Sequence, residues 1–339
     1  MRTTDPSNPA CVALSGGRDS VATALHASER WRVEAAVTVV HEFLDGTCLE
    51  NARRCAERLG LRHELVRVRL RGWFRRALRR GLPICTKCAR TVLTAACLRA
   101  KRLGLLTVLT GHELKGKYGR RVAHPYPPGV TMVRYPALRR WTWEDVGELV
   151  SGLGWFDEGY TCPIRPYGVH RFIERVGYNP LTGRACSLMV ERVASPRACL
   201  EYLIETETPE WDAGEVEERL GLELHRVFEG GVPEGPRDEE EIVRDLTYRL
   251  LMFLERALRS YLSGTLNRIV RTERFAQLHA VLYEYSEIDD RVDDLGYEHL
   301  PRLAVERDEG TARRLLEGTR ALMRELLREY GRRIPGTRV

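Results

Sequence analysis

Apolar positions in the first 150 residues follow two alternating periods. Short runs rich in β-branched residues are typical of buried strands, and apolar residues spaced three or four apart are typical of helices. Strands are predicted at 11–14, 34–40, 63–68, 105–110 and 130–135. Helices are predicted between them, at 19–29, 49–59 and 92–103. This alternation predicts an α/β fold with a doubly wound parallel sheet, in which ligands bind at the carboxyl ends of the strands.

Signals for helix ends accompany this pattern. Gly60 and Gly104 stand where two of these helices should stop, because glycine readily adopts the left-handed conformation that closes a helix. Thr142, followed three residues later by Asp145, resembles a capping box that opens a further helix.

The pattern changes near residue 228. The segment 229–236 is rich in glycine and proline, which favours a linker. A long amphipathic helix is predicted at 239–263, and two or three more helices around 271–285 and 311–331, with no strand pattern among them.

We therefore expect two domains: a catalytic α/β domain at 1–227 and, after a linker at 228–238, an all-α helical bundle at 239–335. No apolar run approaches the roughly 18 residues of a membrane span, and the polar N-terminus does not resemble a signal peptide. We expect a cytoplasmic protein that does not associate with membranes.

Charge divides the chain unevenly. Residues 1–200 hold 33 Lys and Arg against 17 Asp and Glu, whereas the rest holds 21 against 31. A basic half of this kind attracts polyanions such as RNA, because its cations neutralise phosphates. A solvated arginine-rich surface is the simpler alternative.

A glycine-containing loop, Ser15-Gly16-Gly17-Arg18-Asp19-Ser20, joins the first predicted strand to the first helix. The two glycines allow a tight turn and a close approach to a ligand. The helix that follows offers its unpaired amides and the positive end of its dipole to an anion. Ser15 and Ser20 add hydroxyl donors, and Arg18 adds charge. The loop therefore predicts a phosphate site without the Gly-Lys-Ser/Thr ending of a Walker A loop; an ordinary glycine-rich turn is the alternative.

This stretch resembles the SGGxDS signature of the PP-loop family, the N-type ATP pyrophosphatases. The resemblance implies a fold like that of the adenine nucleotide alpha hydrolases, with ATP and Mg²⁺ as cofactors. It also implies adenylation of a carbonyl or carboxyl oxygen with release of pyrophosphate. By this resemblance Asp19 is catalytic, the strand end Val40-His41 lies beside adenine, and Gly111-His112 lies beside the phosphates.

Nine cysteines, an odd number, argue against a disulfide framework in a long chain that we expect to be intracellular. The apolar surroundings of Cys11, Cys55 and Cys97 predict core positions. Cys85 and Cys88 form a CxxC motif before a helix, which by itself indicates a redox pair, half of a metal site or no function. The sequence has no second CxxC, which a four-cysteine zinc site would need.

With its helix and the following Gly111-His112, the motif resembles the tRNA 2-thiolation branch of the PP-loop family, which makes 2-thiocytidine or 2-thiouridine. The resemblance covers roughly residues 10–165. It implies that Cys85, Cys88 and Cys162 hold a [4Fe–4S] cluster with one iron open to sulfur, because thiolates are suitable soft ligands. Alternatively, Cys162 is a turn residue, with Cys186 as its substitute. A persulfide on Cys85 or Cys162 is the other candidate sulfur carrier.

Two features depart from that branch. Lys115 stands where the family pattern has an aspartate, which leaves the magnesium arrangement open, and Glu113 is the candidate to compensate. The terminal zinc-finger cysteines of some 2-thiouridine enzymes are missing, so the chain is closer to the 2-thiocytidine type.

An arginine-rich stretch at 67–80 precedes the CxxC motif. Arginine pairs with phosphates and stacks on bases, so Arg75, Arg76, Arg79 and Arg80 are candidate RNA contacts. An amphipathic helix with a solvated arginine face is equally consistent with the pattern. In the C-terminal part, carboxylates at 284–294 are spaced to share one side of a predicted helix, which indicates a solvated acidic face rather than a magnesium site.

The leading hypothesis is an ATP-dependent tRNA sulfurtransferase that adenylates a pyrimidine C2 oxygen and replaces it with sulfur. Cys85 and Cys162 would be catalytic, and the partners would be tRNA and a sulfur donor such as a cysteine desulfurase, sulfide or a sulfur-carrier protein. The resemblance also implies a homodimer. Two alternatives are a PP-loop enzyme that transfers sulfur or an amide nitrogen to a small molecule, and a non-catalytic nucleotide- or RNA-binding protein.

Overall fold

The computed structural model describes residues 5–113, 122–127, 129–157 and 162–330, and its contacts divide the chain into two compact units. The first unit comprises Met1–Arg171 and Pro209–Pro233, and the second comprises Phe172–Thr208 and Glu234–Val339. This division differs from the predicted one, because the segment after Arg171 groups with the C-terminal helices. Residues 228–238, the predicted linker, contain neither helix nor strand.

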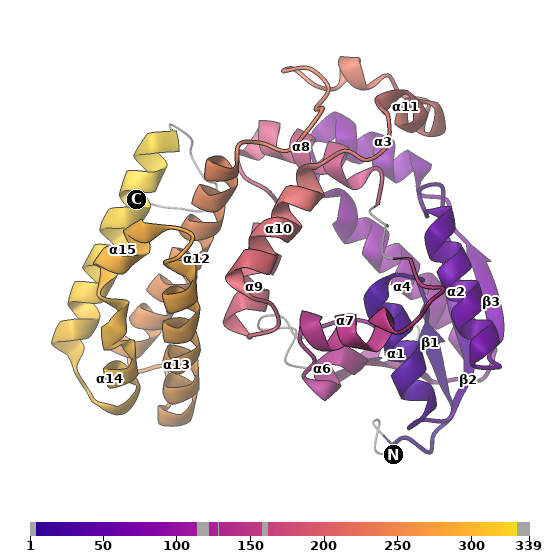
Figure 1. Cartoon of the computed structure of the whole chain (residues 1–339), viewed down its shortest axis with the longest axis horizontal. Coiled ribbons are helices and arrows are strands. Elements are labelled where there is room, and N and C mark those ends of the chain that lie inside the picture. Colours follow the sequence, from indigo (N-terminus) through magenta and orange to yellow (C-terminus); the bar gives the residue numbers. More distant parts are fainter. Residues whose placement is uncertain (1–4, 114–121, 128, 158–161, 331–339) are drawn as a thin grey trace. The chain divides into compact units, whose positions relative to one another are not determined.

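The first unit is built on a six-stranded sheet with the order β3-β2-β1-β4-β6-β5. Figure 1 labels β1, β2 and β3 of this sheet. All neighbouring strands are parallel except β5 and β6. The strands are β1 (Ala10–Ala13), β2 (Val33–Val40), β3 (Arg62–Arg67), β4 (Thr107–Thr110), β5 (Ala123–Tyr126) and β6 (Val130–Arg134). The five predicted strands and the α/β class are confirmed. The antiparallel β5 was not predicted.

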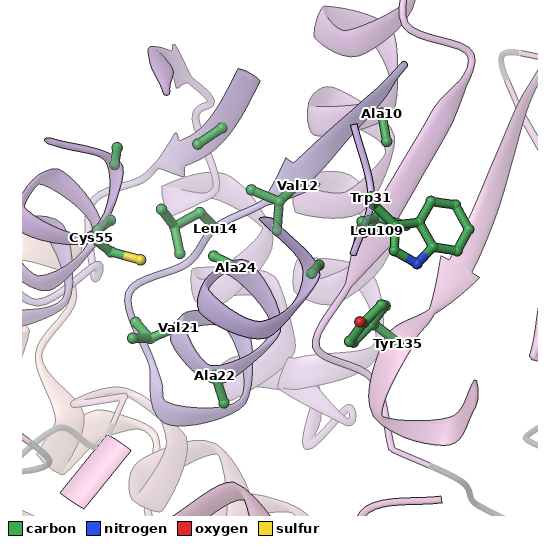
Figure 2. Packing of buried hydrophobic residues seen from close by; sticks show 14 of the residues in the cluster. Ala10, Val12, Leu14, Val21, Ala22, Ala24, Trp31, Cys55, Leu109 and Tyr135 are labelled. Atoms are coloured by element: carbon green, nitrogen blue, oxygen red, sulfur yellow. The ribbon is translucent and has the colours of Figure 1, made fainter. Parts of the chain in front are cut away.

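Both faces of the sheet are buried, and β1 shows why. Its residues alternate between two apolar clusters, because successive side chains of a strand point to opposite faces. Val12 and Leu14 face a layer formed by α1, α2 and α7, and Figure 2 shows them directed toward Val21 and Ala24 of α1. Cys11 faces the other layer, formed by α4. Burial of β1 on both faces fixes the position of the β1–α1 loop at the carboxyl end of this central strand.

The helices of the first unit are α1 (Arg18–Ser28), α2 (Gly46–Arg58), α3 (Arg71–Arg80), α4 (Ile84–Arg102), α6 (Tyr135–Arg139), α7 (Trp143–Ser151), α8 (Arg165–Val176) and α11 (Ala213–Leu220), of which α8 continues into the second unit. Gly60 and Gly104 have positive φ beyond the ends of α2 and α4, as predicted. The capping box of Thr142 and Asp145 is confirmed at the start of α7. A third apolar cluster joins α3, the start of α4, α8 and α11.

In its described residues the second unit contains helices and no strands. The helices are α9 (Thr182–Val190), α10 (Pro196–Glu207), α12 (Glu239–Leu262), α13 (Arg268–Tyr285), α14 (Leu300–Val305) and α15 (Glu309–Tyr330). α12 and α15 lie side by side (Figure 1). The prediction of one helix through 284–294 is wrong, because α13 ends at Tyr285 and a 3₁₀ helix follows at Asp290–Leu295.

A buried ion-pair network ties the second unit together. The Arg237 guanidinium lies 2.9 Å from the Glu207 carboxylate and 2.8 Å from that of Asp245, and both carboxylates are buried. The amide group of Asn179 also donates to Glu207. Because a buried charge is tolerated only when it is paired, this network fixes α10 to α12. Among the described residues, no helix is long and apolar enough to cross a membrane.

Candidate nucleotide-binding loop and cysteine site

The predicted phosphate loop lies where the strand order reverses. β1 is flanked by β2 and β4, so the loop between Ala13 and Arg18 leaves the sheet at the switch point at which open α/β sheets bind ligands. Gly16 has φ +85°, and a Cβ there would lie 1.7 Å from the carbonyl oxygen of Cys48. Only glycine fits this position, because the loop lies against the backbone of α2.

The hydroxyl of Ser20 holds the loop closed on itself. Its Oγ accepts from the amides of Ser15 and Gly16, each at 3.1 Å, and donates to the Gly17 carbonyl at 2.8 Å. Ser20 is buried and its hydroxyl bonds within the loop, so this side chain stabilises the loop conformation. The sequence predicts a donor to phosphate at this position. The N-cap residue of α1 is Gly17, which has no side chain with which to cap the helix. Amides in the first turn of a helix lack intrahelical partners, so this end of α1 suits an anion.

The strand end predicted to meet the phosphates adjoins the same loop. A Cβ on Gly111 would lie 2.7 Å from the carbonyl carbon of Asp19, so the β4 end packs directly against the start of α1. His112 is half-buried. Glu113 is buried, and its carboxylate lies near Arg134, whose pKa is lowered by burial despite this neighbour. Lys115 lies outside the described residues.

The end of β2, predicted to lie beside adenine, turns toward α3. Val40 is the last residue of β2, and the ring of His41 packs edge-on to Phe74, with centroids 6.0 Å apart. Burial lowers the pKa of His41. The next residue, Glu42, accepts from the amides of Leu70 (2.9 Å) and Arg71 (3.3 Å) and so caps α3.

The three predicted cluster ligands lie in one region. Cys85 and Cys88 occupy the first two turns of α4, Cys162 precedes α8, and all three pack against the third apolar cluster. Burial raises the pKa of Cys88 to about 12, and the neighbouring Cys162 and Cys85 thiols add to the effect. None of the nine cysteines, all of them described, forms a disulfide.

Within the described ranges, no group of three or more His, Cys, Asp or Glu side chains is arranged to hold a metal ion. A single ion needs its ligands within a few ångströms of one point. A cubane cluster binds each thiolate at a different iron, so its ligands stand further apart. The donor chemistry of the three thiols suits such a cluster.

A fourth cysteine, Cys48, was not singled out in the sequence. It is buried in the first turn of α2, with its backbone against Gly16 of the phosphate loop. Burial raises the pKa of Cys48 to about 12, with further contributions from Asp45 and from Cys162. Cys48 thus lies at the phosphate loop, and its thiol is close enough to Cys162 for the two to interact electrostatically. The sequence feature that could have identified Cys48 is its position shortly after the second predicted strand, since ligands bind at the carboxyl ends of the strands.

Asn51, one turn further along α2, was also missed. Its buried amide group donates to the carbonyl of Gly16 at 3.3 Å and to that of Asp157 at 2.9 Å. A single side chain thus links the phosphate loop to the segment that precedes Cys162. A polar side chain on a predicted helix gives little indication of such a role, because most are solvated.

The arginine-rich stretch forms α3 and presents its charge outward. Phe74, Ala77 and Leu78 face the core, Arg76, Arg79 and Arg80 are exposed, and Arg75 is half-buried. Both interpretations of this stretch therefore agree with the structure. Cys11, Cys55 and Cys97 are fully buried, as predicted, and Cys186 is buried in the second unit.

Comparison with known proteins adds one relative. A scan against protein-family models finds no match. The chain is 26% identical over 184 residues to an uncharacterized protein of Methanocaldococcus jannaschii. The aligned region covers 52% of this chain and 66%, just under two thirds, of that relative. Its name carries no functional information.

Proposed function

We propose that this protein is a PP-loop ATP-dependent tRNA sulfurtransferase of the cytoplasm, with a fold of the adenine nucleotide alpha hydrolase type. One observation carries the proposal: the Ser15–Ser20 loop lies against the backbone of Cys48 and is tied through Asn51 to the segment before Cys162. Cys162 packs against the same apolar cluster as Cys85 and Cys88. An ATP site and a group of thiols are the two components that activation and sulfur transfer require. Their adjacency lets both steps act on one bound base.

The chain's own groups have distinct tasks in the nucleotide step. The first amides of α1 and the Arg18 guanidinium bind the triphosphate, because both present positive charge at the end of β1. Asp19 would hold Mg²⁺, which when bound supplies further positive charge for the phosphates. The pyrimidine C2 oxygen attacks the α-phosphorus, the bond to the β-phosphate oxygen breaks, and pyrophosphate leaves toward the helix end. The same positive groups stabilise the charge that develops on it.

The sulfur step uses the thiols. Cys85, Cys88 and Cys162 would hold a [4Fe–4S] cluster, which when bound supplies an open iron for sulfur. Sulfur at the oxidation level of sulfide adds at C2, the C2–O bond breaks, and AMP leaves with the C2 oxygen, so that no oxidant or reductant is needed. The apolar cluster around the cysteines limits water, which would otherwise hydrolyse the activated base. The exposed arginines of α3 would bind the tRNA backbone, and the sulfur donor would be sulfide, a cysteine desulfurase or a sulfur-carrier protein.

The test separates the nucleotide site from the thiol site. Cys85→Ala should abolish thionucleoside formation in tRNA, measured by mass spectrometry, while ATP affinity stays near the wild-type value. Cys97→Ala is the matched control, because Cys97 lies on the same helix but packs toward the sheet. Equal loss of ATP binding and thiolation in Cys85→Ala would contradict the division of roles.

A small-molecule substrate is the second candidate, because an amphipathic helix with a solvated arginine face accounts for the exposed arginines of α3 without RNA. It predicts unchanged turnover when the α3 arginines are reversed in charge. A non-catalytic binding protein predicts no pyrophosphate release with tRNA, so measurable release excludes that alternative.

A further inference from the structure

An aromatic side chain outside the loop motif and the cysteine site lies beside the phosphate loop. The guanidinium carbon of Arg18 is 5.7 Å from the centroid of the Trp143 ring. Arg18 Nε also lies 3.6 Å from Oδ1 of Asp19. The side chains of Arg18 and Asp19 keep about a third of their surface exposed, at 34% and 31%. Arg18 therefore contacts both a ring and a carboxylate, yet remains accessible to a ligand.

The backbone that carries Trp143 is firmly placed. Trp143 is the first residue of α7, directly after the capping residue Thr142. Thr142 Oγ1 accepts from the Asp145 amide at 3.1 Å, and the Thr142 amide donates to the Asp145 carboxylate at 2.8 Å. Val146 and Val150 of α7 share the apolar cluster of α1. Trp143 and Arg18 thus stand at the starts of two helices that are packed together.

We propose that Trp143 is a positioning residue that holds the Arg18 guanidinium at the start of α1, where it binds the phosphates of ATP. This inference rests on the proposed ATP site. A planar guanidinium stacks on an indole face and still offers two N–H groups to a phosphate. A lysine ammonium stacks less well and lacks this paired geometry. A ring that fixes Arg18 in advance lowers the entropy lost when the phosphate binds.

The ring serves the phosphates rather than the base. The position proposed for adenine is the β2 end, where His41 packs on Phe74 of α3. Trp143 instead contacts the loop residue that carries the positive charge. A substitution at Trp143 should therefore affect phosphate-containing ligands and leave adenosine binding unchanged.

The experiment measures the dissociation constants of ATP, pyrophosphate and adenosine by calorimetry. Trp143→Ala should weaken ATP and pyrophosphate by about two- to five-fold, with no change for adenosine. In an Arg18→Ala background the same substitution should have no further effect. Trp143→Phe keeps an aromatic face and should recover most of the affinity. It should also remove most of the change in tryptophan fluorescence that ATP causes in the wild type.

The outcomes separate the two proposals. If the wild type binds ATP but Trp143→Ala weakens it equally with and without Arg18, or weakens adenosine as well, the positioning role is overturned and the ATP site stands. If the wild type binds neither ATP nor pyrophosphate, the proposed function fails and the role of Trp143 fails with it. Should Trp143→Ala not fold, the affinities and fluorescence of Trp143→Phe decide the question.

Discussion

Replacing Gly16 with alanine tests the loop geometry on which the ATP site depends. The residue has φ +85°, and a Cβ would meet the Cys48 carbonyl oxygen at 1.7 Å. The left-handed conformation costs a non-glycine residue about 1–2 kcal/mol. Relief of the overlap requires a backbone shift, which costs about 1–3 kcal/mol more. We therefore expect Gly16→Ala to lower the free energy of unfolding by about 2–5 kcal/mol.

Gly17 supplies the matched control one residue away. Its φ is −75°, and the nearest heavy atom to a built Cβ is 3.7 Å distant. Alanine is a poorer N-cap than glycine but loses less backbone entropy on folding, so the two effects roughly cancel. Gly17→Ala should change stability by less than about 0.5 kcal/mol.

Urea unfolding followed by circular dichroism gives the stabilities, and calorimetry gives the ATP affinity of each variant. Gly16→Ala should lose ATP binding even under conditions in which it is folded, since the loop must move away from Cys48. Equal stability and equal ATP affinity of the two variants would refute the reasoning.

Three further predictions concern the thiols, the arginine face and pH. Anaerobically purified wild type should carry about four irons per chain; Cys162→Ala should lose them and Cys97→Ala should keep them, and equal iron in both variants would exclude the cysteine site. Charge reversal of the exposed α3 arginines should weaken tRNA binding and lower the slope of log K against log salt by about 2–3, whereas reversal of three exposed arginines of α15 should not. The arginines reversed are Arg76, Arg79 and Arg80 of α3, and the controls are Arg313, Arg324 and Arg328 of α15. Burial would raise the pKa of Glu42, but its hydrogen bonds from the Leu70 and Arg71 amides outweigh burial and lower it. Glu42→Gln should therefore lower the free energy of unfolding by its full amount at a pH well above the unfolded pKa of about 4.3, and this decrease should vanish as the pH falls through the lowered pKa. A decrease that grows toward acid pH in urea titrations would contradict this prediction.

The central sheet was predictable because its signal is local. Strands buried on both faces appear as short apolar runs, and β1, β2 and β4 are of this kind. Helix ends at Gly60 and Gly104 and the cap at Thr142 follow from the backbone conformations that these residues favour. The antiparallel β5 (Ala123–Tyr126) escaped prediction because its residues, Ala-His-Pro-Tyr, have no strand periodicity and are fixed by pairing with β6.

Long-range packing explains the remaining differences. The segment Phe172–Thr208 joins the helical unit because Glu207 and Asn179 share the ion-pair network of Arg237, which no local pattern reveals. Cys48 and Asn51 reach the site through the placement of α2 against the phosphate loop. Their roles depend on contacts with Gly16 and with the region of Cys162, far along the chain, so residue spacing alone did not identify them.

The most direct test of the proposed function is the stoichiometry of a single turnover with tRNA. Anaerobic enzyme with its cluster, ATP, sulfide and unmodified tRNA should yield one AMP and one pyrophosphate for each thiolated pyrimidine detected by mass spectrometry. Cys85→Ala should yield no thiolated product. ATP cleavage that does not depend on tRNA, or no thionucleoside in any tRNA offered, would contradict the account.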